Sequence, residues 1–118
     1  MWYGSLMKLW HDDIRRPPDD SWVWARTNNE ARYLLQNYRV TEISLDHDLG
    51  LEGPGGEAAV YRRDRGEDTG LDLVDYMIQS ETVPAKVTIH SWNPSGAQRM
   101  EMTLKAKGYR CVRRPYQA

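Results

Sequence analysis

The stretch ISLDHDLG, from Ile43 to Gly50, begins as a buried β-strand and ends in three consecutive ionisable residues. Its apolar half, Ile43 to Leu45, is short and β-prone, which is typical of a central strand. Asp46, His47 and Asp48 follow directly, where that strand stops. Ionisable side chains are unfavourable inside a core. The segment therefore predicts a central strand with a polar site at its carboxyl end.

Strand and helix patterns alternate on both sides of this segment. The other predicted strands are residues 5–11, 22–26, 86–90 and 109–112. The predicted helices begin at Thr27 or Asn28, at Thr69, and at Asn93-Pro94, and the last of them ends at Gly108. Because strands that alternate with helices favour parallel pairing with right-handed crossovers, we expect an α/β fold with a parallel sheet and helices on its faces.

The bulk composition is that of one ordinary globular domain. A chain of 118 residues is long enough for one core, so we expect a single domain over residues 1–118. Its formal charge of -1 gives no general attraction to nucleic acid or membrane. No run is apolar enough to span a bilayer, no secretory signal is evident, and the lone Cys111 has no internal disulfide partner. We therefore expect a cytoplasmic location and no membrane partner.

The segment GLEGPGGEAAVYRRDRGED, residues 50–68, is the only linker-like part of the chain. It is rich in glycine and in charges of both signs. A loop of this length is typical either of a mobile lid over a binding site or of a disordered tip. Both alternatives stay open at this point.

Polar residues follow three of the predicted strands. They are Asp12 and Asp13 after the first strand, Asp46, His47 and Asp48 after the third, and His90, Ser91 and Asn93 around the end of the fourth. Because the carboxyl ends of parallel strands meet at one edge of the sheet, these side chains should converge there. Clustered carboxylates repel one another unless a cation or a shared proton relieves them. A divalent ion is the simplest relief.

The residue types suggest a role for each member of this cluster. Oxygen ligands suit Mg²⁺ or Mn²⁺, and nearby imidazoles widen the choice toward Zn²⁺. The expected metal ligands are Asp12, Asp13 and Asp46; the expected catalytic residues are Asp46, His47, Asp48 and His90; the expected substrate-binding residues are Arg15, Arg16, Ser91 and Asn93. In a metal-free alternative, the two histidines would perform the acid-base chemistry alone.

Each candidate also has a purely structural interpretation. Asp12 and Asp13 are common turn formers, although no helix follows them here. The other structural alternatives are a solvated loop start for residues 46–48, a hydrogen-bonded strand histidine for His90, helix caps for Ser91 and Asn93, and a solvated turn for Arg15 and Arg16. Asp72 is typical of the first turn of a helix.

Four blocks of the sequence resemble one family in the same order along the chain. The blocks LWHDDIRRPP, EISLDHDLG, TGLDLVDYM and IHSWNPSGAQRM are similar to those of the cyclic-phosphate processing receiver-like domains. These domains are a divergent branch of the receiver domains of two-component signalling. The resemblance implies a flavodoxin-like three-layer sandwich with a central five-stranded parallel sheet. It also implies a place in RNA repair or nucleotide signalling.

The chain departs from ordinary receivers in ways that affect its expected function. IRRPPDDS replaces the helix after the first strand, the final helix is missing, and Arg114 stands at the position of the receiver lysine. Arginine is not a neutral replacement for lysine. True phosphoacceptor signalling therefore ranks behind two other hypotheses.

The first hypothesis is a phosphoesterase that acts on a cyclic phosphate. Its substrate would be a nucleotide or RNA end that carries a 2′,3′-cyclic phosphate, or a cyclic nucleotide. The alternative is a non-catalytic receiver-like module that binds a nucleotide or a partner protein, with the carboxylates holding a structural ion. The oligomeric state is left open.

Overall fold

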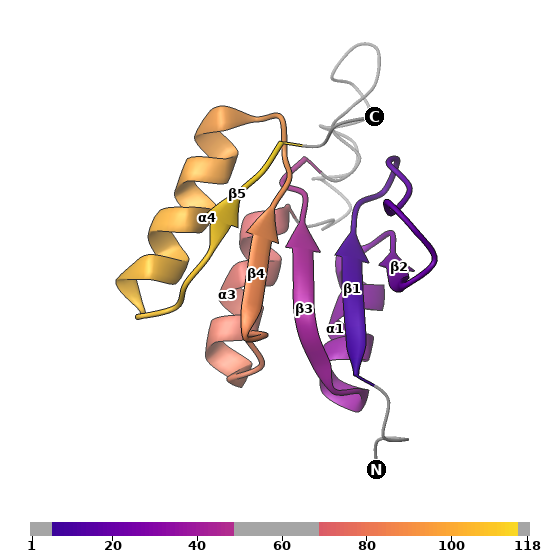
Figure 1. The fold of residues 1–118 in the computed structure, drawn as a ribbon. Coiled ribbons are helices and arrows are strands. Elements are labelled where there is room, and N and C mark those ends of the chain that lie inside the picture. The colour runs from indigo at the N-terminus through magenta and orange to yellow at the C-terminus, as the bar shows by residue number, and fades with distance from the viewer. Residues whose placement is uncertain (1–5, 49–68, 116–118) are drawn as a thin grey trace.

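The computed structural model describes residues 6–48 and 69–115, which form a five-stranded sheet packed against helices (Figure 1). The strands are β1 (Met7–His11), β2 (Trp22–Ala25), β3 (Val40–Leu45), β4 (Lys86–Ile89) and β5 (Val112–Arg113). The helices are α1 (Asn28–Asn37), α3 (Gly70–Ser80) and α4 (Pro94–Ala106). The predicted receiver-like α/β fold is confirmed. The expected loop at 50–68 lies outside the described residues.

All neighbouring strands pair in parallel, in the order β2-β1-β3-β4-β5. The chain runs from β1 outward to the edge strand β2 and then returns to β3 on the other side of β1. Strand order therefore reverses between β1 and β3. In open α/β sheets, ligands bind at such a switch point, beyond the carboxyl ends of the strands.

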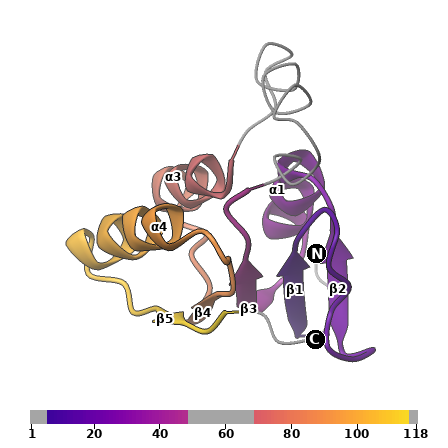
Figure 2. The same ribbon diagram turned by 90° about the horizontal axis from the view of Figure 1, so that it is seen from above.

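The three described helices all lie on one face of the sheet, as Figure 2 shows. The predicted absence of a helix after the first strand is confirmed, because residues 12–21 connect β1 to β2 without one. The core lies between the helices and this face and includes Leu9, Ile43, Leu45, Val87 and Ile89 from the strands and Leu35, Leu73, Met77, Met100 and Leu104 from the helices. Among the described residues, no helix covers the opposite face, so these residues form two layers of the expected three-layer sandwich.

The last strand begins later than the sequence pattern predicts. It was expected at 109–112, but β5 is Val112–Arg113. The amide of Tyr109 donates to the carbonyl oxygen of Leu104, and Gly108 adopts a positive φ of 87°. These features end α4 in a turn, because a left-handed glycine lets the following amides bond back to the helix. Tyr109 therefore belongs to the helix end and not to the strand.

The described residues bear on two features of the chain, its membrane-spanning potential and its single cysteine. The described helices include none that is long and apolar enough to cross a membrane. Cys111 is a free cysteine, and its thiol is buried beside the core.

The start of α3 touches the end of β3 at Gly70. The amide of Gly70 donates to the carbonyl oxygen of His47 at 2.9 Å. A Cβ at this position would lie 2.0 Å from the carbonyl oxygen of Asp46. Only glycine allows this approach, so Gly70 holds the residues that follow β3 against the helix layer.

We expect Gly70→Ala to lower the free energy of unfolding by about 1–3 kcal/mol, since the added methyl group forces α3 away from β3. Urea unfolding followed by tryptophan fluorescence measures this. Gln79→Ala, at an exposed position of the same helix, is the matched control and should change stability by less than about 0.5 kcal/mol. Equal stability of the two variants would contradict the close approach.

Candidate active site

Asp12, Asp46 and His90 lie in one row across β1, β3 and β4. The sheet register pairs His11 with Leu45 and Leu45 with Ile89. The backbone hydrogen bonds of the sheet continue one residue further. The amide of Asp46 donates to the carbonyl oxygen of His11 at 3.0 Å, and the amide of His90 donates to the carbonyl oxygen of Leu45 at 2.9 Å. One ligand atom from each of the three side chains lies within 4.8 Å of the other two. The strand ends thus converge as the sequence predicts.

Asp12 is a fully buried carboxylate that is surrounded by hydrogen-bond donors from other residues. Its Oδ1 accepts from the amides of Ile14 and Arg15, both at 2.8 Å, and its Oδ2 lies 2.9 Å from Nε2 of His90. Burial alone would raise the pKa of Asp12, but the hydrogen bonds from His90 and from the two amides outweigh it and hold the pKa below its usual range. Asp12 is therefore ionised at neutral pH.

His90 is held on three sides. Its Nε2 faces Asp12, its Nδ1 lies 2.7 Å from Oγ of Ser44, and its ring stacks on Trp10 with centroids 4.0 Å apart. Burial lowers the pKa of His90 despite the hydrogen bond to Asp12, so the neutral imidazole is favoured. A neutral ring that donates from Nε2 to Asp12 accepts at Nδ1 from the Ser44 hydroxyl.

Arg15 supplies the positive charge beside the carboxylates. Its Nη1 lies 3.6 Å from Oδ2 of Asp12 and 4.0 Å from Oδ2 of Asp46. Its guanidinium stacks over Trp92, which is 58% exposed, at 4.4 Å from the ring centroid. The indole of Trp10 donates to the carbonyl oxygen of Arg15 at 2.7 Å and so fixes this part of the loop. Arg15 thus lies between two buried anions and an exposed aromatic ring.

His47, Asp48 and Asn93 form a second group next to the first. Nδ1 of His47 lies 2.6 Å from Oδ1 of Asp48, which also accepts from the side-chain amide of Asn93 at 2.9 Å. A Cβ at Gly96 would lie 2.5 Å from the His47 ring, so the ring packs against the first turn of α4. The amide of His47 donates to Oδ1 of Asp46 at 2.9 Å and joins the two groups.

The comparison with known families agrees with this geometry. The family model of the cyclic-phosphate processing receiver domain matches residues 7–106, which include both groups of side chains. The chain belongs to this family. Neither the curated proteins nor the solved structures contain a match to the chain. The family resemblance of the four sequence blocks is therefore confirmed by one independent comparison.

The remaining predicted residues of this receiver domain occupy different places. Among the described residues, the group of potential ligand atoms contains no atom of Asp13, and the backbone carbonyl of Asp13 accepts two hydrogen bonds from Arg26. Ser91 is buried, and its Oγ accepts from the amide of Asn93 at 3.1 Å. Arg16 lines a groove on the helix-free face. Their assigned roles in metal or substrate binding stay predictions.

The structural interpretations of Asn93 and Asp72 as helix-terminal residues are confirmed. Asn93 caps α4, since its Oδ1 accepts from the amide of Gly96 at 3.0 Å, and it also contacts Asp48. Asp72 accepts from the amide of Thr69 at 2.9 Å and forms a capping box at α3. Asp72 is thus the first-turn acid that its position predicts.

Sequence reasoning missed Ser44 and Trp10, which hold His90. Ser44 is the one polar residue between Ile43 and Leu45, and its register places it opposite Trp10. A polar residue between two apolar core residues was the available signal. Its contact with His90 became visible only once the register of β3 against β4 was known.

The donor set suits a divalent ion. Two carboxylates and one imidazole are buried together, and these ligands are found at Mn²⁺ and Zn²⁺ sites and, for the oxygens, at Mg²⁺ sites. A cation here would share the charge that Arg15 now balances. His90 could then bind through Nε2 and donate from Nδ1 to Ser44, because a hydroxyl can accept as well as donate.

We expect Mn²⁺ to raise the melting temperature of the wild-type protein, since an ion that binds only the folded state stabilises it by about 2.7 kcal/mol at a concentration of 100 Kd. Differential scanning fluorimetry with Mg²⁺, Mn²⁺, Zn²⁺ or EDTA measures the effect. Asp46→Asn should abolish it, whereas Asp75→Asn, at an exposed position of α3, should retain it. An equal shift in all three proteins would place the ion elsewhere.

His11 is a core histidine and not part of the cluster. It is fully buried, and its Nε2 lies 2.7 Å from Oδ1 of Asn28, whose amide donates to the carbonyl oxygen of Thr69 at 2.9 Å. This chain of hydrogen bonds links β1, α1 and the start of α3. Burial lowers the pKa of His11 to about 4.

This lowered pKa predicts the pH dependence of stability. The unfolded histidine binds a proton below its ordinary pKa of 6.5, whereas the folded one does so only near 4, so acid favours unfolding within this window. We expect His11 to make the protein about 2 kcal/mol less stable at pH 5 than at pH 7, measured by urea unfolding in EDTA. His11→Gln should reduce this difference, and an unchanged difference would refute the assignment.

Proposed function

We propose that this protein is a phosphoesterase that opens a cyclic phosphate on a nucleotide or an RNA end. The observation that carries the proposal is the row of Asp12, Asp46 and His90 at the switch point of the sheet, with Arg15 against the two carboxylates. Membership of the cyclic-phosphate processing receiver family supports the substrate class. The buried anions, the arginine and the two histidines provide the groups that phosphoryl transfer requires.

Arg15 binds the phosphate in this proposal. Its guanidinium is planar and can donate to two phosphate oxygens at once. It comes from the loop after β1 and already lies between the carboxylates and the exposed Trp92. A divalent ion held by Asp12, Asp46 and His90 would supply Lewis-acid stabilisation of the charge that develops on the phosphoryl oxygens.

His47 transfers the proton. Asp48 lies 2.6 Å from its Nδ1, which keeps the proton on that nitrogen and makes Nε2 the accepting atom. Nε2 takes a proton from the attacking water while the water oxygen bonds to phosphorus. The bond from phosphorus to one ring oxygen breaks, and the imidazolium returns the proton to that oxygen. The product is a phosphomonoester.

His90 positions the carboxylates. Its Nε2 and Nδ1 already contact Asp12 and Ser44, and Trp10 stacks on the ring. These contacts fix the ring, and its burial lowers its pKa and so favours the neutral form. The division of work between the two histidines follows from their neighbours, since His47 is oriented by a carboxylate in the way that a general base requires.

The second candidate function is a non-catalytic module that binds a nucleotide or a partner protein. One observation favours it: Asp12, His90 and Arg15 satisfy one another within the protein. Such a closed network can have a purely structural role. Only turnover separates the two candidates.

The test is turnover of 2′,3′-cyclic and 3′,5′-cyclic nucleotides, each with Mg²⁺, Mn²⁺ or EDTA. We expect hydrolysis of at least one of the two types of cyclic phosphate, and ³¹P NMR monitors the reaction. His47→Ala should reduce kcat at least about 100-fold, the usual range for loss of general acid-base catalysis. Asp46→Asn and His90→Ala should reduce turnover as well, because both disturb the carboxylate row.

Asp75→Asn is the control, since this carboxylate is exposed on α3 away from β3. The binding of each nucleotide is measured in parallel by calorimetry. Binding without turnover under any condition would favour the module over the enzyme.

A further inference from the structure

The face of the sheet without described helices has an ordered arrangement of side chains. Side chains alternate along a strand, so those of Leu9, Ile43 and Ile89 point to the helices and their neighbours point away. The register sets these neighbours in rows. One row contains Trp22, Lys8, Glu42 and Lys86; the next contains Trp24, Trp10, Ser44, Thr88 and Val112; the third contains Asp12, Asp46, His90 and Arg114.

The third row is the candidate active site, and the second leads directly to it. Arg114 joins the third row because its amide donates to the carbonyl oxygen of Ile89 at 2.8 Å, as the amide of His90 does to Leu45. The side chain of Arg114 lines the groove on the helix-free face. The cation that contacts the carboxylates is Arg15. Arg114 therefore stands beside the site and is available for another part of a ligand.

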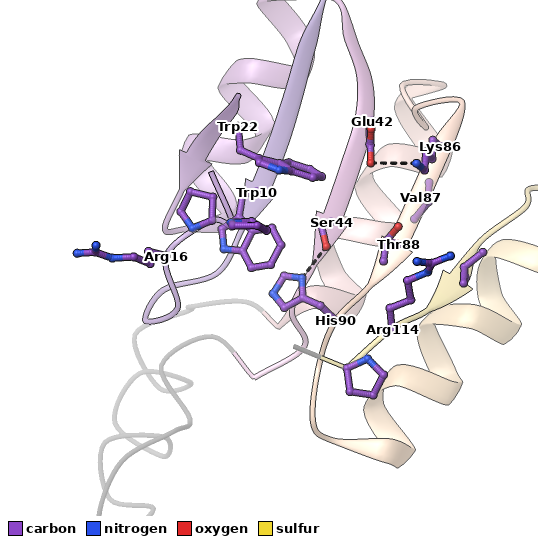
Figure 3. Close-up of a pocket in the computed structure, with 14 residues that line it drawn as sticks. Trp10, Arg16, Trp22, Glu42, Ser44, Lys86, Val87, Thr88, His90 and Arg114 are labelled. Carbon is purple, nitrogen blue, oxygen red and sulfur yellow. Dashed lines mark hydrogen bonds and ion pairs between the residues drawn. The ribbon is translucent and has the colours of Figure 1, made fainter. Parts of the chain in front are cut away.

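A groove of about 620 Å³ runs along this face. Figure 3 shows Trp10 and Trp22 on one side of it, Arg114 on the other, and His90 between them. Its floor includes the polar side chains of Ser44 and Thr88. Pockets of 300–1,000 Å³ are typical of small-ligand sites. The groove therefore has the volume for one small molecule.

His90 connects the groove to the carboxylates. Its ring lines the groove, stacks on Trp10 and bonds to Asp12 through Nε2. A ligand in the groove that reaches past His90 meets the candidate phosphate site. The groove and the site are thus two parts of one continuous surface.

We propose that the groove binds the nucleoside of the substrate, with the base between the tryptophan side and Arg114 and the phosphate at the His90 end. This inference rests on the proposed function and adds where its substrate is recognised. Bases stack on indole rings and on guanidinium planes. Trp10, Trp22 and Arg114 line the groove, and Lys8 lies over the Trp22 ring, with its Nζ 4.4 Å from the centroid. The tryptophan wall is fixed, since Trp22 packs edge-on against Trp10 at 5.6 Å.

The chemistry of the groove favours a nucleoside over a docked helix or a second copy of the chain. An amphipathic helix needs an apolar groove. Here the floor contributes hydroxyl groups from Ser44 and Thr88, and Glu42 pairs with Lys86 at 3.5 Å. Ribose hydroxyls and base edges can bond to such groups. A positive side chain opposite the aromatic side complements an electron-rich ring and a negative phosphate.

The test measures the affinity for adenosine 3′-monophosphate and uridine 3′-monophosphate by calorimetry in EDTA, where turnover is not needed. We expect Trp22→Ala to weaken binding about tenfold, as loss of one base-stacking ring does. Trp22→Tyr should restore most of the affinity. Val23→Ala is the matched control, because Val23 follows on the same strand and points to the other face.

The opposite side is tested in the same way. Arg114→Met should weaken binding, whereas Arg113→Met should not, because Arg113 points toward α4 and lies 3.5 Å from Glu101. Circular dichroism confirms that each variant folds. Equal affinities for the Trp22 and Val23 variants, or for the Arg114 and Arg113 variants, would overturn the inference.

A base-free cyclic phosphate separates the inference from the proposed function. We expect kcat/KM for adenosine 2′,3′-cyclic phosphate to exceed that for glycerol 1,2-cyclic phosphate at least tenfold. Equal values with normal turnover would overturn the groove and leave the phosphoesterase standing. Nucleotide binding that depends on Trp22, without turnover of glycerol 1,2-cyclic phosphate or of any 2′,3′-cyclic or 3′,5′-cyclic nucleotide, would support the groove and refute the phosphoesterase. An effect of Trp22→Ala on the oligomeric state alone would show that a second copy occupies the face.

Discussion

The parallel register of β1, β3 and β4 is the constraint on which the rest of this protein depends. The pairs His11–Leu45 and Leu45–Ile89 bring Asp12, Asp46 and His90 into one row. A slip of one residue in β3 would turn Asp46 toward the helices and Leu45 toward solvent, because side chains alternate with a period of two. The apolar core therefore enforces the register, and the register places the site.

The loop that replaces the first helix has two effects that belong together. It brings Arg15 to the buried carboxylates, where the amides of Ile14 and Arg15 also bond to Asp12. It also leaves the second face of the sheet without a helix among the described residues. The same change thus supplies a local cation and opens the groove beside His90.

The sequence predicts the fold and the converging strand ends because both follow from local rules. Polar residues after apolar strands mark the edge of a parallel sheet, which is enough to find Asp12, Asp46 and His90. It does not predict Ser44 or Trp10, since their contact with His90 requires the register of three strands. Nor does it distinguish Arg15 from Arg16, because that depends on the path of a loop without regular structure. The start of β5 was predicted too early, because the turn that ends α4 includes Tyr109.

The position of His90 between the groove and the carboxylates has a consequence for the thermodynamics of the molecule. The ring is held by Trp10 on the groove side and by Asp12 on the other. A ligand in the groove would therefore change the surroundings of the His90 ring, and so would an ion at the carboxylates. Linkage requires that such an effect be reciprocal: if a nucleoside tightens ion binding by some factor, the ion tightens nucleoside binding by the same factor. Through one imidazole, ligand binding in the groove and ion binding at the carboxylates would thus be linked equilibria.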